Sequence, residues 1–432
     1  QPGYGGGVLI YYASGAVLEN CTITGNSSKQ GGGIAIRNNV QDNPNPEQIL
    51  NCTIANNDMN VADGYGAGVS ILEKGYAEFT SCTLQNNSMS AEAKWDVGGG
   101  GAVAQFSWSN GPAETTFTNC EFIGNAATDD GGAITVYSSD ASLTNSVILD
   151  GCTFSGNSTT ENGGALRMRG PGVGTIRDCQ FLDNTATVSG TDIGWGGAIY
   201  TEIAGRSVDI ENSVFAGNDS DDFGAAIYLN NNTSDGRIIN CTFAENTAAT
   251  DPGNKAQIDL RTGTAITIAN NIFYNVATSG VREVTSASVD PAMKNNLFHE
   301  VTGWDLWHDG AGYSGENIND LALGSGNNAG NPNFAGSGNY ELNAFSAAVA
   351  SADPAEAPAT DVAGTARPLP VGTAPDIGAY EETTSNAPNQ SPAGYLEGSP
   401  GGTTSYLAGG VGAGAGDFEF NSRLALTDIS GG

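Results

Sequence analysis

Positive charge is scarce in this chain of 432 residues. Only 15 lysines and arginines accompany 47 aspartates and glutamates, so the formal net charge is −32 at pH 7. Such a surface disfavours binding to nucleic acid or to an anionic membrane surface, and it suits a secreted protein that tolerates salt or binds cations. We therefore expect no nucleic-acid partner.

Histidine is scarcer still, since His299 and His308 are the only two. No Ser/His/Asp arrangement and no HExxH motif can be assembled from the sequence. Few groups are left to act as a base or to neutralise developing charge. The sequence therefore predicts no catalytic residue and no enzyme.

Long apolar runs are missing as well, and no segment reaches the length needed to span a bilayer. No leader with a basic and an apolar part is present either. We expect an extracellular or cell-surface protein without a membrane span, secreted with its signal peptide already removed.

Helical periodicity is absent, and a repeat of about thirty residues takes its place. Each unit is marked by an apolar residue that follows a pair of small residues. These markers are Val8, Ile34, Val69, Val103, Ile134, Leu166, Ile199, Ile227 and Ile258. Unequal steps around a constant period indicate a solenoid with loops of varying length.

The second half of the unit carries a cysteine column and, two residues later, an apolar column. The cysteine column holds Cys21, Cys52, Cys82, Cys120, Cys152, Cys179 and Cys241, with Ser213, Asn271 and Asn296 in the remaining units. The apolar column is Ile23, Ile54, Leu84, Phe122, Phe154, Phe181, Phe215, Phe243, Phe273 and Phe298. This alternation predicts a strand with both columns directed inward.

All seven cysteines share that one column, which bears on disulfide formation. Neighbouring strands lie ~4.8 Å apart, whereas the Cβ atoms of a relaxed disulfide lie about 3.8 Å apart. We predict a ladder of buried free thiols that behave as small hydrophobes. A thiolate metal site would need clustered ligands such as CxxC, and none occurs.

Asparagine forms a third column, three residues beyond the apolar one, and we predict turns there. It consists of Asn26, Asn57, Asn87, Asn125, Asn157, Asn184, Asn218 and Asn246. The unit thus consists of three short strands separated by turns. Stacked units of this kind form a parallel β-helix, in which like residues pile into ladders.

The pairing of Gly-Gly-Ala-Ile at 131–134 with Phe-x-x-Asn at 154–157 resembles the repeats of chlamydial polymorphic outer-membrane proteins. Related secreted bacterial right-handed β-helix proteins share these repeats. The resemblance covers roughly residues 5–300 and implies a right-handed parallel β-helix. It implies no particular chemistry, because the repeat is a scaffold signature.

We predict an all-β protein in three parts. Residues 1–300 form a right-handed parallel β-helix of about ten coils, and residues 301–381 form a C-terminal capping region that closes its end. Within that region, residues 376–381 look like the sequence that closes the β-helix in many anchored bacterial surface proteins. Residues 382–432 are a Gly/Ser/Thr-rich tail that is a candidate intersubunit strand.

Three kinds of site are candidates. Acidic turns are weak Ca²⁺ candidates, with solvated turns as the alternative, and we predict no other cofactor. These acids are Asp129, Asp130, Asp219, Asp221 and Asp222. Asn-x-Ser/Thr triplets make glycosylation candidates of Asn26, Asn157, Asn218 and Asn232. Tryptophans at 95, 108 and 195 stand in or near loops, where they can stack on sugar rings or, as the alternative, pack onto their own coil.

Three function classes remain open. The first is a structural solenoid that assembles head to tail with itself into a filament or surface layer, because coil one begins at Gly5 without room for a cap. The second is an adhesin that binds surface glycans. The third is a polysaccharide lyase or hydrolase, which a concentration of carboxylates and a basic residue on one coil face would favour.

Overall fold

The computed structural model describes residues 3–383 except 13–14, 38–44, 62–63, 91–98, 109–110, 141, 189–193, 203–205, 231–235, 249–254, 262–265 and 284–289. From residue 384 onward the predicted tail, residues 382–432, lies outside this range, and its role as an intersubunit strand stays a prediction. No helix in the described part of the chain has the length and apolar character needed to cross a bilayer.

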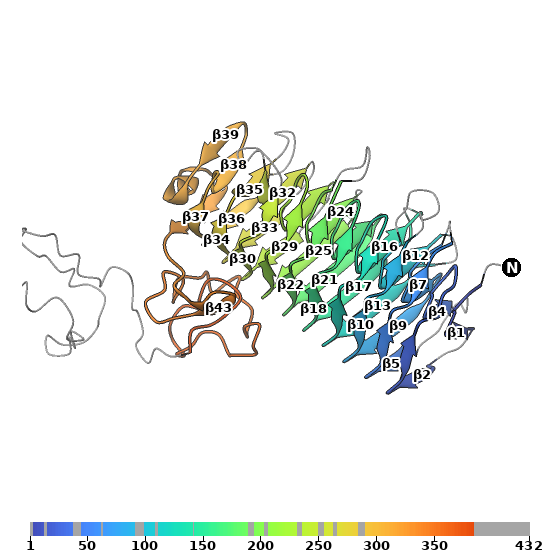
Figure 1. The fold of residues 1–432 in the computed structure, drawn as a ribbon. Coiled ribbons are helices and arrows are strands. Elements are labelled where there is room, and N and C mark those ends of the chain that lie inside the picture. Colours follow the sequence, from blue (N-terminus) through green and yellow to red (C-terminus); the bar gives the residue numbers. More distant parts are fainter. Residues whose placement is uncertain are drawn as a thin grey trace, which may run out of the picture.

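Each coil adds one strand to each of three long sheets, which run side by side along the solenoid (Figure 1). Sheet 1 contains β1 (Val8–Tyr11), β4 (Ile34–Arg37), β8 (Val69–Leu72), β12 (Val103–Ser107), β16 (Ile134–Ser138), β20 (Leu166–Arg169), β24 (Ile199–Glu202), β28 (Ile227–Asn230), β32 (Ala256–Arg261), β35 (Ser279–Glu283), β38 (Leu306–His308) and β39 (Ala311–Tyr313). All its pairings are parallel except that between β38 and β39.

Sheet 2 follows sheet 1 within each coil. It contains β2 (Val17–Glu19), β5 (Glu47–Leu50), β9 (Tyr76–Thr80), β13 (Glu114–Thr118), β17 (Asn145–Asp150), β21 (Gly172–Arg177), β25 (Arg206–Glu211), β29 (Gly236–Ile239), β33 (Ile266–Ala269), β36 (Ala292–Lys294) and β40 (Gly324–Ser325).

Sheet 3 follows sheet 2 within each coil. The predicted cysteine column directly precedes its strands, and the phenylalanine column lies within them. It contains β3 (Thr22–Thr24), β6 (Thr53–Ala55), β10 (Thr83–Gln85), β14 (Glu121–Ile123), β18 (Thr153–Ser155), β22 (Gln180–Leu182), β26 (Val214–Ala216), β30 (Thr242–Ala244), β34 (Ile272–Val276), β37 (Leu297–Val301) and β41 (Asn328–Ala329). Sheets 2 and 3 have 11 strands each, so the described chain makes eleven coils where about ten were predicted.

A fourth sheet, of seven strands with two residues each, was not predicted, because so short a segment shows no alternation. It contains β7 (Asp58–Met59), β11 (Ser88–Met89), β15 (Ala126–Ala127), β19 (Ser158–Thr159), β23 (Thr185–Ala186), β27 (Asp219–Ser220) and β31 (Thr247–Ala248). Each coil in the middle of the solenoid therefore has four strands, not three.

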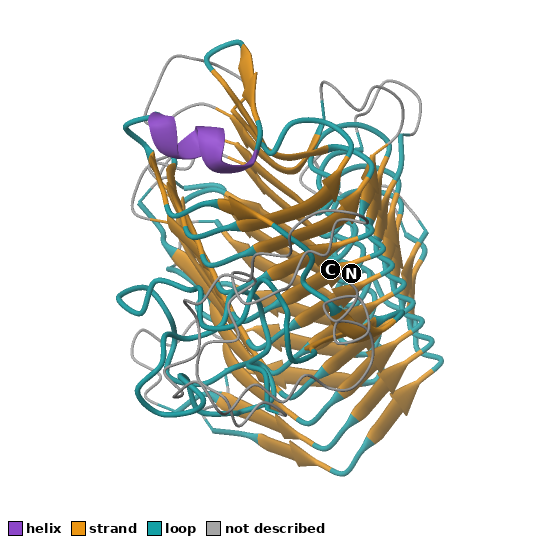
Figure 2. Cartoon of the chain, turned by 90° about the vertical axis from the view of Figure 1, so that its left-hand side faces the viewer, coloured by secondary structure: helices purple, strands orange, loops and turns teal. Residues whose placement is uncertain are grey.

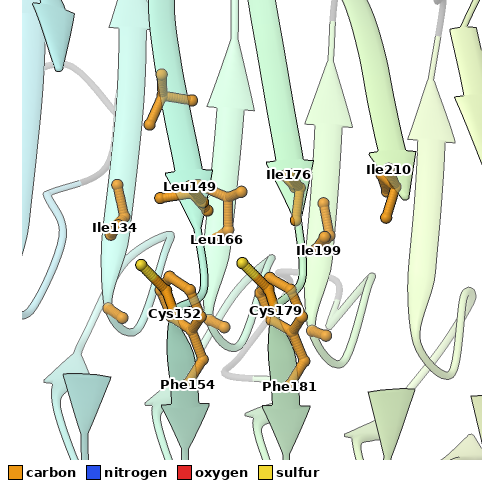
Figure 3. Packing of buried hydrophobic residues seen from close by; sticks show 14 of the residues in the cluster. Ile134, Leu149, Cys152, Phe154, Leu166, Ile176, Cys179, Phe181, Ile199 and Ile210 are labelled. Carbon is orange, nitrogen blue, oxygen red and sulfur yellow. The ribbon is translucent and has the colours of Figure 1, made fainter. Parts of the chain in front are cut away.

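Inward residues of the three long sheets meet in one core, and Figure 3 shows its middle coils. Identical positions pair in register, as Phe154 does with Phe181. Their rings stack 4.7 Å apart and 3° from parallel. The predicted phenylalanine ladder is confirmed, and it runs without a break from Phe122 to Phe298.

The glycine pair turns the chain into sheet 1. Gly131 has φ +68°, a conformation that favours glycine. A Cβ atom on Gly132 would come within 2.1 Å of the Gly164 carbonyl oxygen of the next coil. The marker is therefore glycine because adjacent coils approach each other closely at this corner.

The cysteine column points inward as predicted, and all seven thiols are free. Its sulfur atoms also accept hydrogen bonds: the backbone N–H of Cys21 donates to Sγ of Cys52 at 3.4 Å. Ser213 occupies the same position in a later coil, and its Oγ accepts the N–H of Cys179 at 3.2 Å. The expectation that the thiols behave only as small hydrophobes is therefore incomplete, because they also link coils.

The asparagine column lies at the bends between sheets 3 and 4, but its side chains point inward. From Asn57 onward they are fully buried. The Asn157 Nδ2 donates to Oδ1 of Asn184 at 2.9 Å and to the backbone carbonyl of Phe122 at 2.9 Å. The column is thus a continuous ladder of buried amides, which satisfies backbone groups that the bends leave unpaired.

The solenoid extends one coil beyond the predicted boundary at residue 300, because β38, β40 and β41 continue the three sheets. Its end is covered by the β38–β39 hairpin and by the 3₁₀ helix η3 (Gly315–Asp320), drawn purple in Figure 2. Asn319 of η3 accepts the side-chain N–H of Asn327 at 3.0 Å. This side chain takes the place that the next coil would occupy.

Residues 330–383, which include the hairpin of β42 (Phe334–Gly336) and β43 (Asn339–Leu342), lie beside the coils (Figure 1). Of the predicted capping region 301–381, the part that covers the end is therefore the stretch before residue 330, which contains β38, β39 and η3. The Gly378 N–H donates to the Asn270 carbonyl at 2.8 Å, and the Asn240 Nδ2 donates to the Asp376 carbonyl at 2.8 Å. The outward side of sheet 3 is apolar in these coils, at Val214, Ala216, Ala244, Ile272 and Leu297.

We expect Phe181→Ala to lower the free energy of unfolding by about 3–5 kcal/mol, because it opens a cavity in the ring ladder. Ile123→Ala, on the outward side of sheet 3, is the control and should cost less than about 1 kcal/mol. Urea unfolding of both variants measures this. Equal losses would contradict the packing described.

One thiol should react in the folded protein. Cys21 is half-buried in the first coil, whereas the other six thiols are buried. We expect a thiol reagent to modify Cys21 alone until urea exposes all seven, and Cys21→Ser to abolish the native reaction. Intact mass spectrometry counts the modified sites, and native labelling of several thiols would show that the column opens.

Asp305 should make the stability depend on pH. Burial raises the pKa of this carboxyl to about 6 from 3.8, and its Oδ2 accepts the Gly315 N–H at 2.5 Å. A raised pKa favours the folded state below pH ~4, and this contribution is lost as the pH rises through 6. We expect Asp305→Asn to raise the free energy of unfolding by about 1–3 kcal/mol at pH 8 and to change it little at pH 4. Asp320→Asn, at an exposed position, is the control for urea unfolding at both pH values.

Candidate functional site

The outer face of sheet 1 carries charged and aromatic side chains along the described coils. Positions in the sheet 1 strands are counted from the residue that is in register with Ile134, such as Leu166 or Ile258. Residues at the second and fourth positions point outward, because those at the first and third positions fill the core. The second positions from coil five onward are Thr135, Arg167, Tyr200, Tyr228, Asp259, Arg282 and Trp307. The fourth positions are Arg37, Leu72, Phe106, Tyr137, Arg169, Glu202, Asn230 and Arg261.

Arginine is concentrated on this face. Of the 15 lysines and arginines in the chain, five arginines stand in these two columns. They are Arg37, Arg167, Arg169, Arg261 and Arg282. One third of the basic residues of this acidic protein therefore stand in two columns of one face, and four more belong to the strands of sheet 2.

An ion-pair network surrounds Arg167. Its NH1 lies 2.5 Å from Oδ2 of Asp130, and both side chains are at most 4% exposed. Burial raises the pKa of Asp130 to about 6, although Arg167 opposes the shift. Glu202 joins Arg167 to Arg169, at 3.4 and 3.5 Å. The side chains of Arg169 and Glu202 are 28% and 27% exposed, so these are the members that a ligand can reach.

A second pair is buried completely. Nε of Arg282 lies 2.5 Å from Oδ1 of Asp259, whose side chain has no exposed surface. The other carboxylate oxygen of Asp259 accepts the Gly224 N–H at 2.6 Å. Burial raises the pKa of Asp259 to about 6, while Arg282 lowers it. We assign this pair a structural role, since no substrate can reach it.

Aromatic rings flank the charged groups. Trp195 stacks on the buried Tyr228, with ring centroids 4.7 Å apart, and its indole N–H donates to Asp222 at 3.0 Å. The Arg261 guanidinium lies 5.5 Å from the Trp195 ring centroid, within cation–π range. Trp195 is half-buried, so part of its ring remains on the surface.

A second aromatic group stands nearer the N-terminal end of the face. Trp108 is half-buried and stacks on Phe106 with centroids 5.9 Å apart, and Phe106 contacts Tyr137 at 5.4 Å. Two of the three tryptophans singled out in the sequence therefore lie against sheet 1. Trp95 lies outside the described residues.

The two groups of predicted acidic residues differ in whether the structure brings their carboxylates together. Asp129 and Asp130 form a cluster with Glu161, whose carboxylate oxygens lie within 4.8 Å of theirs. Both oxygens of Asp130 are already engaged, one by Arg167 and the other by Asn162 at 3.0 Å. A Ca²⁺ ion would have to displace these partners.

The structure does not bring Asp219, Asp221 and Asp222 together as a metal cluster among the described residues. Asp219 accepts the hydroxyl of Thr247 at 2.5 Å, and Asp222 forms an ion pair with Lys255 at 2.8 Å. The carboxylates of Asp219 and Asp222 each bind a residue of the next coil instead.

Burial excludes two of the four glycosylation candidates. Asn157 and Asn218 are fully buried members of the amide ladder, so the folded protein cannot carry a glycan on either. Asn26 is half-buried at the open end of the ladder and stays a prediction. Asn232 lies outside the described residues.

A second acidic cluster was missed by the sequence analysis. Glu283, His308 and Asp309 offer ligand atoms within 4.8 Å of one another at the C-terminal end of sheet 1. No motif signals it, because Glu283 and His308 belong to different coils. Stacking alone brings them together.

Comparison with known proteins supports the architecture. The profile of the family described as "Right handed beta helix region" matches residues 2–112 and 104–298. No curated protein matches the sequence. Among solved structures, the chain is similar to the crystal structure of pectate lyase Pel9A, with 15% sequence identity and a TM-score of 0.34 over 88% of this chain and 87% of that one. At that TM-score the likeness carries no argument about activity.

Proposed function

The chain belongs to the right-handed β-helix family, and on this scaffold we propose that it binds acidic polysaccharide along the outer face of sheet 1. The carrying observation is that three half-buried arginines, Arg37, Arg169 and Arg261, stand in one column of that face. Guanidinium groups pair with the carboxylates of acidic sugars through two parallel hydrogen bonds.

The arrangement of the face also suits a chain-like ligand. The columns repeat at the coil spacing of ~4.8 Å, so equivalent positions recur along a line. Half-exposed rings of Trp108, Tyr137 and Trp195 offer apolar surfaces for sugar rings. Arg169 and Glu202 supply charge-assisted hydrogen bonds between them. In this proposal the protein acts outside the cell, as an adhesin or glycan-binding surface protein.

Breakdown of the bound glycan is the second candidate. The pair of Arg169 and Glu202 favours it, because carboxylates and a basic residue on one coil face are what a lyase or hydrolase requires. The two buried pairs, Arg167–Asp130 and Arg282–Asp259, do not contribute to it, since a substrate cannot contact them.

Head-to-tail assembly has less support. The hairpin of β38 and β39 and the η3 helix cover the C-terminal end of the coils, where an added coil would have to pair. We therefore prefer the glycan-binding proposal to the filament.

Affinity electrophoresis in gels that contain pectate or alginate tests the proposal. We expect retardation by these acidic glycans that decreases with salt, and a loss of about tenfold in affinity for Arg169→Gln. Arg177→Gln is the matched control, because Arg177 pairs with Glu211 at 3.6 Å on sheet 2, away from the face.

Equal effects of the two substitutions would refute a specific face. New reducing ends or unsaturated products in the same gels would move the assignment from binding to catalysis. An absence of retardation by either polymer would end the proposal.

A further inference from the structure

The third position of the sheet 1 strands changes character at the C-terminal end. This inward position is apolar in most of the preceding coils, with Val136, Met168 and Leu260 among its members. In the last two coils it holds Glu283, which pairs with Leu260 in register, and then His308. Both are at most 9% exposed. Two buried ionisable side chains in a mostly apolar column require a compensating interaction.

The two side chains are arranged as an oriented imidazole. Nδ1 of His308 lies 2.6 Å from Oε2 of Glu283. When Nδ1–H donates to this carboxylate, the neutral ring carries its lone pair on Nε2. Carboxylates hold metal-ligating histidines in the same way.

Nε2 of His308 faces a second carboxylate. It lies 3.6 Å from Oδ2 of Asp309, whose side chain is 58% exposed in the turn between β38 and β39. In this neutral tautomer the Nε2 lone pair and the Asp309 carboxylate repel each other unless a proton on Nε2 or a metal ion stands between them. Two ligands of a tetrahedral zinc ion, each about 2.1 Å from it, lie about 3.4 Å apart.

We propose that His308 and Asp309 bind a divalent transition-metal ion of the zinc class, with Glu283 orienting the imidazole and water completing the coordination. The nitrogen ligand favours this class over Ca²⁺, which takes oxygen ligands. The site is separate from the proposed glycan face and does not depend on it.

The imidazole of His308 is the group that the carboxylates of Glu283 and Asp309 both face. Among the described residues, neither Glu283 nor Asp309 forms an ion pair with lysine or arginine. The cluster of Asp129, Asp130 and Glu161 differs in this respect, because Arg167 forms an ion pair with Asp130.

Calorimetric titration of the full chain with Zn²⁺ at neutral pH tests the site, in a Cys21→Ser background that removes the half-buried thiol. We expect one equivalent to bind. His308→Ala should weaken binding about 100-fold, and Asp309→Asn and Glu283→Gln should each weaken it about tenfold or more. His299→Ala is the matched control and should bind as before, since His299 lies outside the site, beside Glu300 and stacked on Tyr274.

Co²⁺ absorption spectra of the same proteins identify the ligands independently of the calorimetric titration. Bands of four- or five-coordinate Co²⁺ that disappear in Asp309→Asn support the site, and this exposed substitution leaves the fold intact. Failure of Zn²⁺ to saturate the protein, survival of binding in Asp309→Asn, or equal affinity for Ca²⁺ would each overturn the proposal.

Discussion

Parallel pairing between identical positions of successive coils is the interaction on which the rest of this structure depends. Phe154 pairs with Phe181, and Asn157 bonds to Asn184, because the two coils are in register. A shift by one residue would turn every inward side chain outward. The ring, thiol and amide ladders therefore fix the register, and the register in turn determines which side chains meet on the surface.

Side chains that do not contribute to the register are free to carry other chemistry. The first and third residues of the sheet 1 strands must fill the core, whereas the second and fourth face outward. Arginine, tyrosine and carboxylate residues gather in those outward columns. Their buried members, such as Asp259 with Arg282, hold coils together, and their half-exposed members, such as Arg169 with Glu202, remain available to a ligand.

The C-terminal end shows how the ladders stop. A side-chain amide replaces the missing coil twice: Gln257 accepts from Asn246 at 2.8 Å, and Asn319 accepts from Asn327 at 3.0 Å. Sheet 1 ends in an antiparallel hairpin instead of a further parallel strand. Beyond the last coil the chain returns to the outward side of sheet 3, where small and apolar residues such as Ala216 and Ala244 receive it.

The sequence by itself determined the repeat, the strand order within a coil and the inward direction of the cysteine and phenylalanine columns. It could do so because each of these features depends on residues of one coil and recurs at about the same spacing. The turn signal of asparagine, by contrast, did not reveal a buried ladder, since the partner of Asn157 is the equivalent side chain of the next coil. Burial of that amide is a property of the stack.

Only the tertiary structure decided where the functional groups meet. Arg169 and Glu202, or Glu283 and His308, are separated by a whole coil in sequence and become neighbours because the coils stack in register. The docking of residues 330–383 beside the coils, and not over their end, also depends on the outward surface of sheet 3. Irregular segments have no periodic pattern from which their contacts could be predicted. Where such a segment docks is therefore determined by tertiary packing.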